Sequence, residues 1–157
     1  MLGFAFRMRD IVQKNQIDQL LHQLAIRCKS PGRIYLVEGI FEAIYDLKDM
    51  LQINIELASP DNFMPVLPGW EERSQWVASF NHVEFYHYDF YSQALSKILR
   101  GHTRDLRDVQ SMLEQNLINP KELKRLFKAI EPKLITYPSI NPKNFKKQVE
   151  VFFGPIS

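Results

Sequence analysis

The sequence lacks the features that mark secreted, membrane-spanning and disulfide-stabilised proteins. Its single cysteine, Cys28, cannot form an intramolecular disulfide, which suits a reducing cytoplasm, and we expect an inert, partly buried thiol there. No run approaches the roughly 18 apolar residues of a membrane-spanning helix, and the apolar segment 1–7 is too short for a secretory signal. We therefore expect a cytoplasmic protein with no membrane partner.

An excess of charge of one sign is also missing. The 20 basic and 18 acidic residues leave a net charge of +2, and the two kinds are interleaved along the chain. Bulk composition therefore carries no signature of nucleic-acid binding, so nucleic acid is neither implied nor excluded. The hydrophobic fraction of 45% excludes a disordered, collagen-like or coiled-coil protein, and 157 residues fit one globular domain that spans the chain.

Common catalytic motifs are absent from the sequence as well. It contains no glycine-rich phosphate loop, no nucleophile elbow and no paired-cysteine motif. The spacing of His82, His87 and His102 does not match a helical metal pair. His87 and Asp89 would share one face of a strand, but two ligands do not make a zinc site.

In the first part of the chain, the hydrophobic pattern predicts alternating helices and strands. Apolar residues recur at helical spacing from about 11 to 26 and from 40 to 50. A short buried strand is predicted at 33–37, and strict alternation predicts another at 52–58. The order strand, helix, strand is typical of a right-handed βαβ unit. The proline-rich stretch after residue 58 is predicted to be an ordered loop anchored by Phe63, Leu67 and Trp70.

The second part is predicted to hold a hairpin followed by helices. The β-prone runs 75–80 and 83–88 are separated by two residues, the length of a tight turn. Four helices are then expected at 90–100, from 103, at 120–130 and from 142. The first is predicted to begin at a cap by Asp89 and to end at Gly101, and the second to begin at a cap by Thr103. The third is predicted to begin at a cap by Asn119 with Glu122 as reciprocal acid, and the fourth at Asn141 and Pro142. We therefore predict an α/β (α+β) fold with a small mixed sheet of about four strands, flanking helices and a helical C-terminal half.

Glu56 is the first candidate functional residue. It lies on the polar face of the predicted strand 52–58, and a sheet covered on both sides leaves such a carboxylate in need of water, a cation or a partner. Glu56 could therefore bind a divalent metal at a catalytic centre. The alternative is a solvent-facing or ion-paired residue at a sheet edge.

The second candidate is the charged stretch from Lys97 to Asp108, which spans a helix end, a turn and a helix start. It is dense in groups that bind phosphate or pair with one another: Lys97, Arg100, Arg104, Asp105 and Asp108. Lys97 and Arg100 share a helix face. The alternative is structural, with Arg104 and Asp108 forming an ion pair within one helix and Asp105 favoured by the helix dipole.

The order of several motifs resembles a bacterial family of nucleotidyltransferase-fold proteins that is related to the toxin nucleotidyltransferases of abortive-infection systems. The resemblance covers most of the chain from Arg33 onward. It rests on Arg33-Ile34-Tyr35-Leu36-Val37, on the segment 51–61, on Pro68-Gly69-Trp70-Glu71, on Phe85-Tyr86-His87-Tyr88-Asp89 and on the stretch from Lys97 to Asp108.

The resemblance implies a particular chemistry and also a deficit. In that family a glycine-rich turn and an Asp-x-Asp strand precede a third acid, which matches Glu56. Carboxylates there hold two metal ions, Mg²⁺ for an active enzyme, that activate a hydroxyl and neutralise a nucleoside triphosphate. In this sequence Val37 runs directly into Glu38-Gly39, so about 25 to 30 residues with the turn and the pair are missing by this comparison.

These expectations lead to three hypotheses. The first is a degenerate, non-catalytic nucleotidyltransferase-fold protein that binds a nucleotide or a protein partner, as in a toxin–antitoxin system. The second is an active Mg²⁺-dependent nucleotidyltransferase whose metal-binding segment is absent from this version of the chain. The third is a plain structural or interaction module. A sheet that lost an internal strand would also keep an open edge, which predicts self-association into a homo-oligomer.

Overall fold

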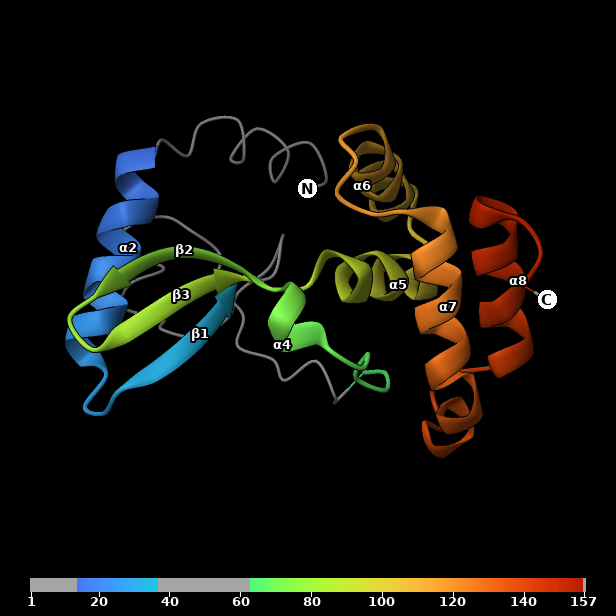
Figure 1. Cartoon of the computed structure of the whole chain (residues 1–157), viewed down its shortest axis with the longest axis horizontal. Helices are drawn as coiled ribbons and strands as arrows, with labels where there is room; N and C mark the ends of the chain where they lie inside the picture. Colours follow the sequence, from blue (N-terminus) through green and yellow to red (C-terminus); the bar gives the residue numbers. More distant parts are fainter. Residues whose placement is uncertain (1–13, 37–62, 157) are drawn as a thin grey trace. The chain divides into compact units, whose positions relative to one another are not determined.

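The computed structural model describes residues 14–36 and 63–156 (Figure 1). Within them the chain forms two compact units. The first unit holds residues 14–36 and 76–86, and the second holds 63–75 and 87–156. The predicted helix at 40–50, the predicted strand at 52–58 and the junction after Val37 lie outside the described residues. The expectation of a single domain stays a prediction.

The first unit is a helix packed on a small mixed sheet. Helix α2 (Lys14–Arg27) precedes strand β1 (Gly32–Leu36), and strands β2 (Gln75–Phe80) and β3 (Val83–His87) form the predicted hairpin. The sheet order is β1-β3-β2, so three strands are described where about four were expected. Figure 1 shows β1 and β3 pointing the same way and β2 the opposite way, which makes the sheet mixed. Asn81 takes the left-handed conformation that the tight turn requires, with φ of 52°.

The core of this unit lies between α2 and one face of the sheet. Leu21 and Ala25 of α2 pack against Val83 and Phe85 of β3, all of them buried. Complete burial of Phe85 stabilises the unit by about 2 to 3 kcal/mol. Cys28 is half-buried at the rim of this core, as expected.

The second unit is built from helices, which confirms the predicted helical C-terminal half. It contains α4 (Trp70–Arg73), α5 (Phe90–Arg100), α6 (Thr103–Glu114), α7 (Pro120–Ile130), the 3-10 helix η2 (Glu131–Thr136) and α8 (Pro142–Phe153). No helix in the described part of the chain is long and apolar enough to cross a membrane. The fully buried large side chains at its centre are Leu67, Leu95, Ile98, Leu123, Leu126, Phe127, Ile130, Leu134 and Phe145.

Several predicted helix ends are confirmed in this unit. The Asp89 carboxylate accepts hydrogen bonds from the backbone N–H groups of Tyr91 and Ser92, so Asp89 caps α5. Gly101 ends α5 in the left-handed conformation, with φ of 68°. Asn119 caps α7 through the N–H groups of Lys121 and Glu122. Each of these ends is set by residues within a few positions along the chain, which is why the sequence predicts them.

One predicted cap and one predicted capping contact are wrong. Residue His102, in extended conformation, occupies the N-cap of α6, and Thr103 is the first helical residue. Glu122 does not act as the reciprocal acid of the α7 cap, because its carboxylate binds Arg125. The backbone N–H of Asn119 instead donates to the hydroxyl of Tyr91, at 3.1 Å. A side chain from α5 thus replaces the local partner that the motif predicts.

The loop before α4 is only partly anchored as predicted. Leu67 is buried and the Trp70 ring packs against Tyr88, with centroids 5.2 Å apart. Phe63 does not anchor the loop, since 54% of it is exposed. Met64 and Pro65 are buried in its place, because the chain turns the next two side chains inward after Phe63.

Candidate functional site

The predicted charged stretch forms a compact group where α5 ends and α6 begins. The N–H of Gly101 donates to the carbonyl oxygen of Lys97 at 3.0 Å, which closes α5 and reverses the chain. Because α6 then packs on α5, the basic residues at the end of α5 face the acidic residues at the start of α6. We call this group the α5–α6 charge cluster: Lys97, Arg100, Arg104, Asp105 and Asp108.

Lys97 is the buried centre of this cluster, with only 3% of the residue exposed. Its Nζ lies 2.5 Å from Oδ2 of Asp108 and 3.9 Å from Oδ1 of Asp105. An ammonium group removed from water needs compensating anions, and the two carboxylates provide them. The side chain of Lys97 is therefore held in place by two residues of α6.

Arg100 and Asp105 form a second, more exposed ion pair in the same cluster. Nε of Arg100 lies 3.1 Å from Oδ2 of Asp105, and Nη2 lies 2.8 Å from Oδ1. This fork geometry is the strongest arrangement that an arginine makes with a carboxylate. Asp105 thus binds Arg100 directly and lies near Lys97, in addition to its favourable place in the first turn of α6.

Arg104 differs from the other cations of the cluster. It is half-buried, and within residues 14–36 and 63–156 it forms no ion pair. The alternative of an Arg104–Asp108 pair within α6 is wrong, because Asp108 binds Lys97 of the neighbouring helix instead. Since Arg104 and Asp108 are four residues apart, Arg104 lies on the same side of α6 as the Lys97 contact.

A further, partly buried ion pair joins Arg73 of α4 to Asp89, and sequence reasoning missed it. Nε and Nη2 of Arg73 donate to the two oxygens of Asp89 at 3.0 and 2.8 Å, while Nη1 donates to the carbonyl oxygen of Pro68. The hydrogen bonds to Asp89 raise the pKa of Arg73 above its ordinary value. Because Asp89 also caps α5, this pair joins the start of α5 to α4.

Nothing in the sequence around Arg73 distinguishes it from its charged neighbours. Glu71 and Glu72 precede it, and the whole hairpin separates it from Asp89. The Arg73–Asp89 pair could therefore be identified only from the folded structure, in which the chain comes back to α4 after the hairpin.

The carboxylates of the cluster do not fit the Mg²⁺ site that the resemblance implies. No group of three or more His, Cys, Asp or Glu side chains that could hold a metal ion occurs among the described residues. Asp105 and Asp108 are already bound by Arg100 and Lys97. Glu56, the predicted metal ligand, lies outside the described residues. The two aspartates of the cluster therefore have cations as partners, and hard metal ions need free oxygen ligands.

A family model described as a nucleotidyltransferase of unknown function (DUF6036) matches residues 10–154. No curated protein and no solved structure matches the chain.

Proposed function

Since the chain belongs to this family of nucleotidyltransferases of unknown function, we propose that it binds a nucleoside triphosphate at the α5–α6 charge cluster without transferring the nucleotide. The proposal rests above all on Arg104, a half-buried residue whose guanidinium forms no ion pair in the described part of the chain. A guanidinium without a counter-charge beside it favours an anionic ligand. Phosphate oxygens match the planar fork of arginine.

The other members of the cluster support this role by fixing its geometry. The cluster has three cations against two carboxylates, so it keeps one positive charge in excess. Asp105 and Asp108 hold Lys97 and Arg100 before any ligand arrives, which reduces the entropy lost on binding. We expect the triphosphate to contact Arg104 and the exposed part of Arg100.

The absence of nucleotidyl transfer is proposed from the chemistry that the reaction needs. The family mechanism requires carboxylates that hold two metal ions around the triphosphate. The sequence contains no Asp-x-Asp pair and no two adjacent glycines. The two aspartates of the cluster are committed to Lys97 and Arg100. A single Glu56 does not replace such a clamp.

Titration calorimetry with ATP, GTP, CTP and UTP tests the binding proposal. We expect one of the four to bind, and Arg104→Ala to raise its Kd at least about tenfold, since a charge-assisted phosphate contact is worth roughly 1.5 to 3 kcal/mol. Arg27→Ala is the matched control, because Arg27 is an exposed arginine at the end of α2. The proposal fails if none of the four binds, or if both variants bind as wild type does.

The rival hypothesis of an active Mg²⁺-dependent enzyme predicts a different outcome. Incubation with radiolabelled triphosphates, Mg²⁺ and a cell extract would then transfer label to a macromolecule, and Glu56→Ala would abolish the transfer. Intact mass and the encoding DNA show separately whether further residues follow Val37 in the natural protein. Label transfer by this chain would overturn the non-catalytic part of the proposal.

A toxin–antitoxin role with a protein partner is the finer function that the family resemblance suggests. Expression of the chain in a bacterial host, alone and with the adjacent gene, tests that role. Growth arrest that the second gene relieves would support it, and unaffected growth in both cases would contradict it.

A further inference from the structure

The charge of this nearly neutral chain is divided unevenly along its length. Residues 120–157 hold eight of the 20 basic residues but three of the 18 acidic ones. That segment therefore carries a net charge of +5, while the first 119 residues carry −3. An asymmetry of this size between two parts of one chain indicates an anionic partner for the basic part.

The basic residues of α7 lie opposite the face that the helix buries. Leu123, Leu126, Phe127 and Ile130 point into the core. Three lysines follow one another on the outer side of the helix at spacings of three and four residues: Lys121, Lys124 and Lys128. Lys121 and Lys128 thus present ammonium groups to solvent, while Lys124 between them is half-buried.

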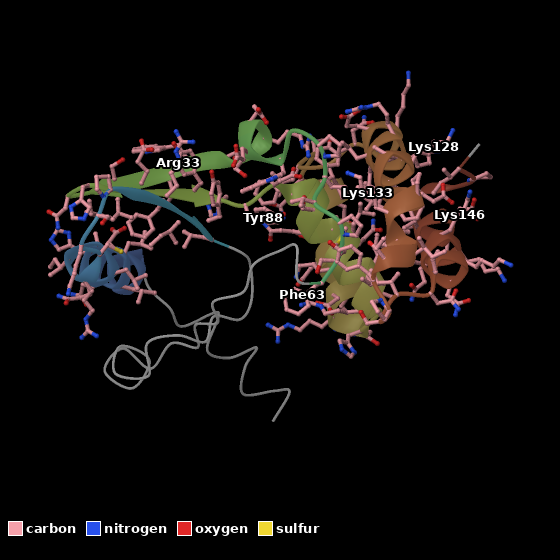
Figure 2. The ribbon with its side chains drawn as sticks, turned by 90° about the horizontal axis from the view of Figure 1, so that it is seen from below. Arg33, Phe63, Tyr88, Lys128, Lys133 and Lys146 are labelled. Atoms are coloured by element: carbon pink, nitrogen blue, oxygen red, sulfur yellow. The ribbon has the colours of Figure 1, made fainter. Side chains whose placement is uncertain are left out.

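Helix α8 extends the same surface. Lys143 and Lys147 are exposed, and Lys146 binds Glu131 of η2 at 3.1 Å. In α7, Nζ of Lys124 donates to the carbonyl oxygen of Pro155, which follows α8. The first contact joins α8 to η2, and the second joins α7 to the segment that follows α8. Figure 2 labels Lys128 of α7, Lys133 of η2 and Lys146 of α8 in the helical unit.

Most of these cations have no acidic partner. Arg125 pairs with Glu122, and Lys146 pairs with Glu131. The other six form no ion pair with any residue that the structure describes, and we call them the α7–α8 lysine surface: Lys121, Lys124, Lys128, Lys133, Lys143 and Lys147. The charge of this surface is therefore available to a ligand.

We propose that the α7–α8 lysine surface binds double-stranded RNA through its phosphates. Lysine acts as a point charge that suits phosphate groups without reading sequence. A protein partner fits poorly, because the cores of protein interfaces are depleted of lysine and enriched in aromatic residues. An anionic membrane also fits poorly, since the apolar faces of α7 and α8 are already buried in the core and leave only Ile135 and Val151 exposed nearby.

The exposed side chains of this surface favour duplex RNA over other nucleic acids. Single strands bind to exposed aromatic rings on which bases stack, and no aromatic side chain of residues 120–156 is exposed. Sequence-specific DNA binding inserts one protruding helix with base-reading side chains into the major groove. Here both helices lie side by side and present lysines, which suits the recognition of A-form RNA by its backbone and shape.

Fluorescence anisotropy with a labelled 20-base-pair RNA duplex tests this proposal on the full chain. We expect binding that weakens steeply with salt, with a slope of log K against log salt of about −5 for six contacts to a duplex. The variant Lys128→Gln/Lys147→Gln should lose about two units of that slope and at least tenfold in affinity at 100 mM salt. The charge-preserving Lys128→Arg/Lys147→Arg should bind as wild type does.

The matched control is Arg27→Gln/Lys29→Gln, which removes two exposed charges from the first unit. It should leave RNA binding within twofold of wild type, and circular dichroism should show all variants folded. The proposal is overturned by any of four results: no RNA binding, an equal loss in the control, equally tight binding of the same duplex in DNA or of single-stranded RNA, or tighter binding of vesicles rich in phosphatidylglycerol. Because these lysines lie outside the α5–α6 charge cluster, Arg104→Ala should leave RNA binding intact, which keeps this proposal distinct from triphosphate binding.

Discussion

The two charged regions of the helical unit place the same residue types in opposite environments. In the α5–α6 charge cluster, Lys97 is 3% exposed and lies between Asp105 and Asp108. On the α7–α8 lysine surface, Lys128 and Lys147 are exposed and form no ion pair with the described residues. Lys97 therefore holds two helices together, whereas Lys128 and Lys147 remain available to a ligand. Burial separates the two cases, because a desolvated ammonium needs a fixed partner.

The charges of the two regions should also contribute differently to the free energy of unfolding. Removing one member of a buried ion pair leaves the other charge uncompensated, at a cost of several kcal/mol. Exposed pairs contribute between zero and about 1 kcal/mol. Substitutions of the ion-paired residues of the α5–α6 charge cluster should therefore change stability. Substitutions on the α7–α8 lysine surface should change binding alone.

The largest effect is expected at Asp89, the most buried carboxylate of the unit. Asp89→Ala removes the partner of Arg73 and the cap of α5 together, and should lower the free energy of unfolding by about 3 to 5 kcal/mol. Urea denaturation followed by circular dichroism measures it. Asp89→Asn keeps a capping oxygen and should lose less. A loss under 1 kcal/mol for the alanine variant would contradict a structural role for this pair.

Lys97 and Lys128 test the comparison directly. Lys97→Ala should cost about 2 to 3 kcal/mol, because Asp108 loses its buried counter-charge and a packed side chain disappears. Lys128→Ala should change the free energy of unfolding by less than about 0.5 kcal/mol. The same denaturation experiment measures both variants. Equal losses of stability in the two variants would show that burial does not decide how much a lysine contributes to the free energy of unfolding.

Gly101 tests how closely the turn positions the cluster. Its φ of 68° is unfavourable for a residue with a Cβ atom, so Gly101→Ala should cost about 1 to 2 kcal/mol. The added Cβ would lie 3.3 Å from Nε2 of Gln148, the end of a flexible side chain, so the cost comes mainly from the backbone. Gly101→Asn, which tolerates this conformation, should lose less in thermal denaturation. An alanine variant as stable as wild type would show that the turn relaxes freely.

The smallest effect is expected for the exposed Glu122–Arg125 pair on α7. Hydrogen bonds from Arg125 lower the pKa of Glu122 below its ordinary value of 4.5, so the folded state favours the ionised carboxylate. This stabilisation is complete at neutral pH and is lost as the pH falls below about 4.5 through the lowered pKa. Glu122→Gln should reduce the Tm by about 1 °C or less at pH 7, and by progressively less as the pH falls through the lowered pKa. A difference that grew in acid would contradict the assigned sign.

The sequence predicted the local parts of this fold well. Apolar spacing located the helices of the second unit, and the two-residue turn at Asn81 and His82 located the hairpin. Asp89, Gly101 and Asn119 act on groups within a few residues of themselves, so their roles could be read from neighbouring positions. The Glu122 cap failed because Tyr91, a residue of another helix, took the hydrogen bond that the motif requires.

The candidate site was predictable as a group but not in its pairing. Lys97 to Asp108 span one short turn, so their proximity follows from the sequence alone. Which carboxylate binds which cation depends on how α6 packs on α5. In this packing Asp108 binds Lys97, and Arg104 forms no ion pair with the described residues. The Arg73–Asp89 pair was invisible in the sequence, because the hairpin that brings its members together separates them by 16 positions.

The sequence by itself determined the succession of helices, the hairpin and the unequal division of charge, because each depends on residue type and short-range spacing. The tertiary structure alone decided which charges are buried together and which face solvent. Helix packing sets the local desolvation of each ammonium and guanidinium group, and that desolvation separates Lys97, a structural cation, from the six lysines offered to a ligand.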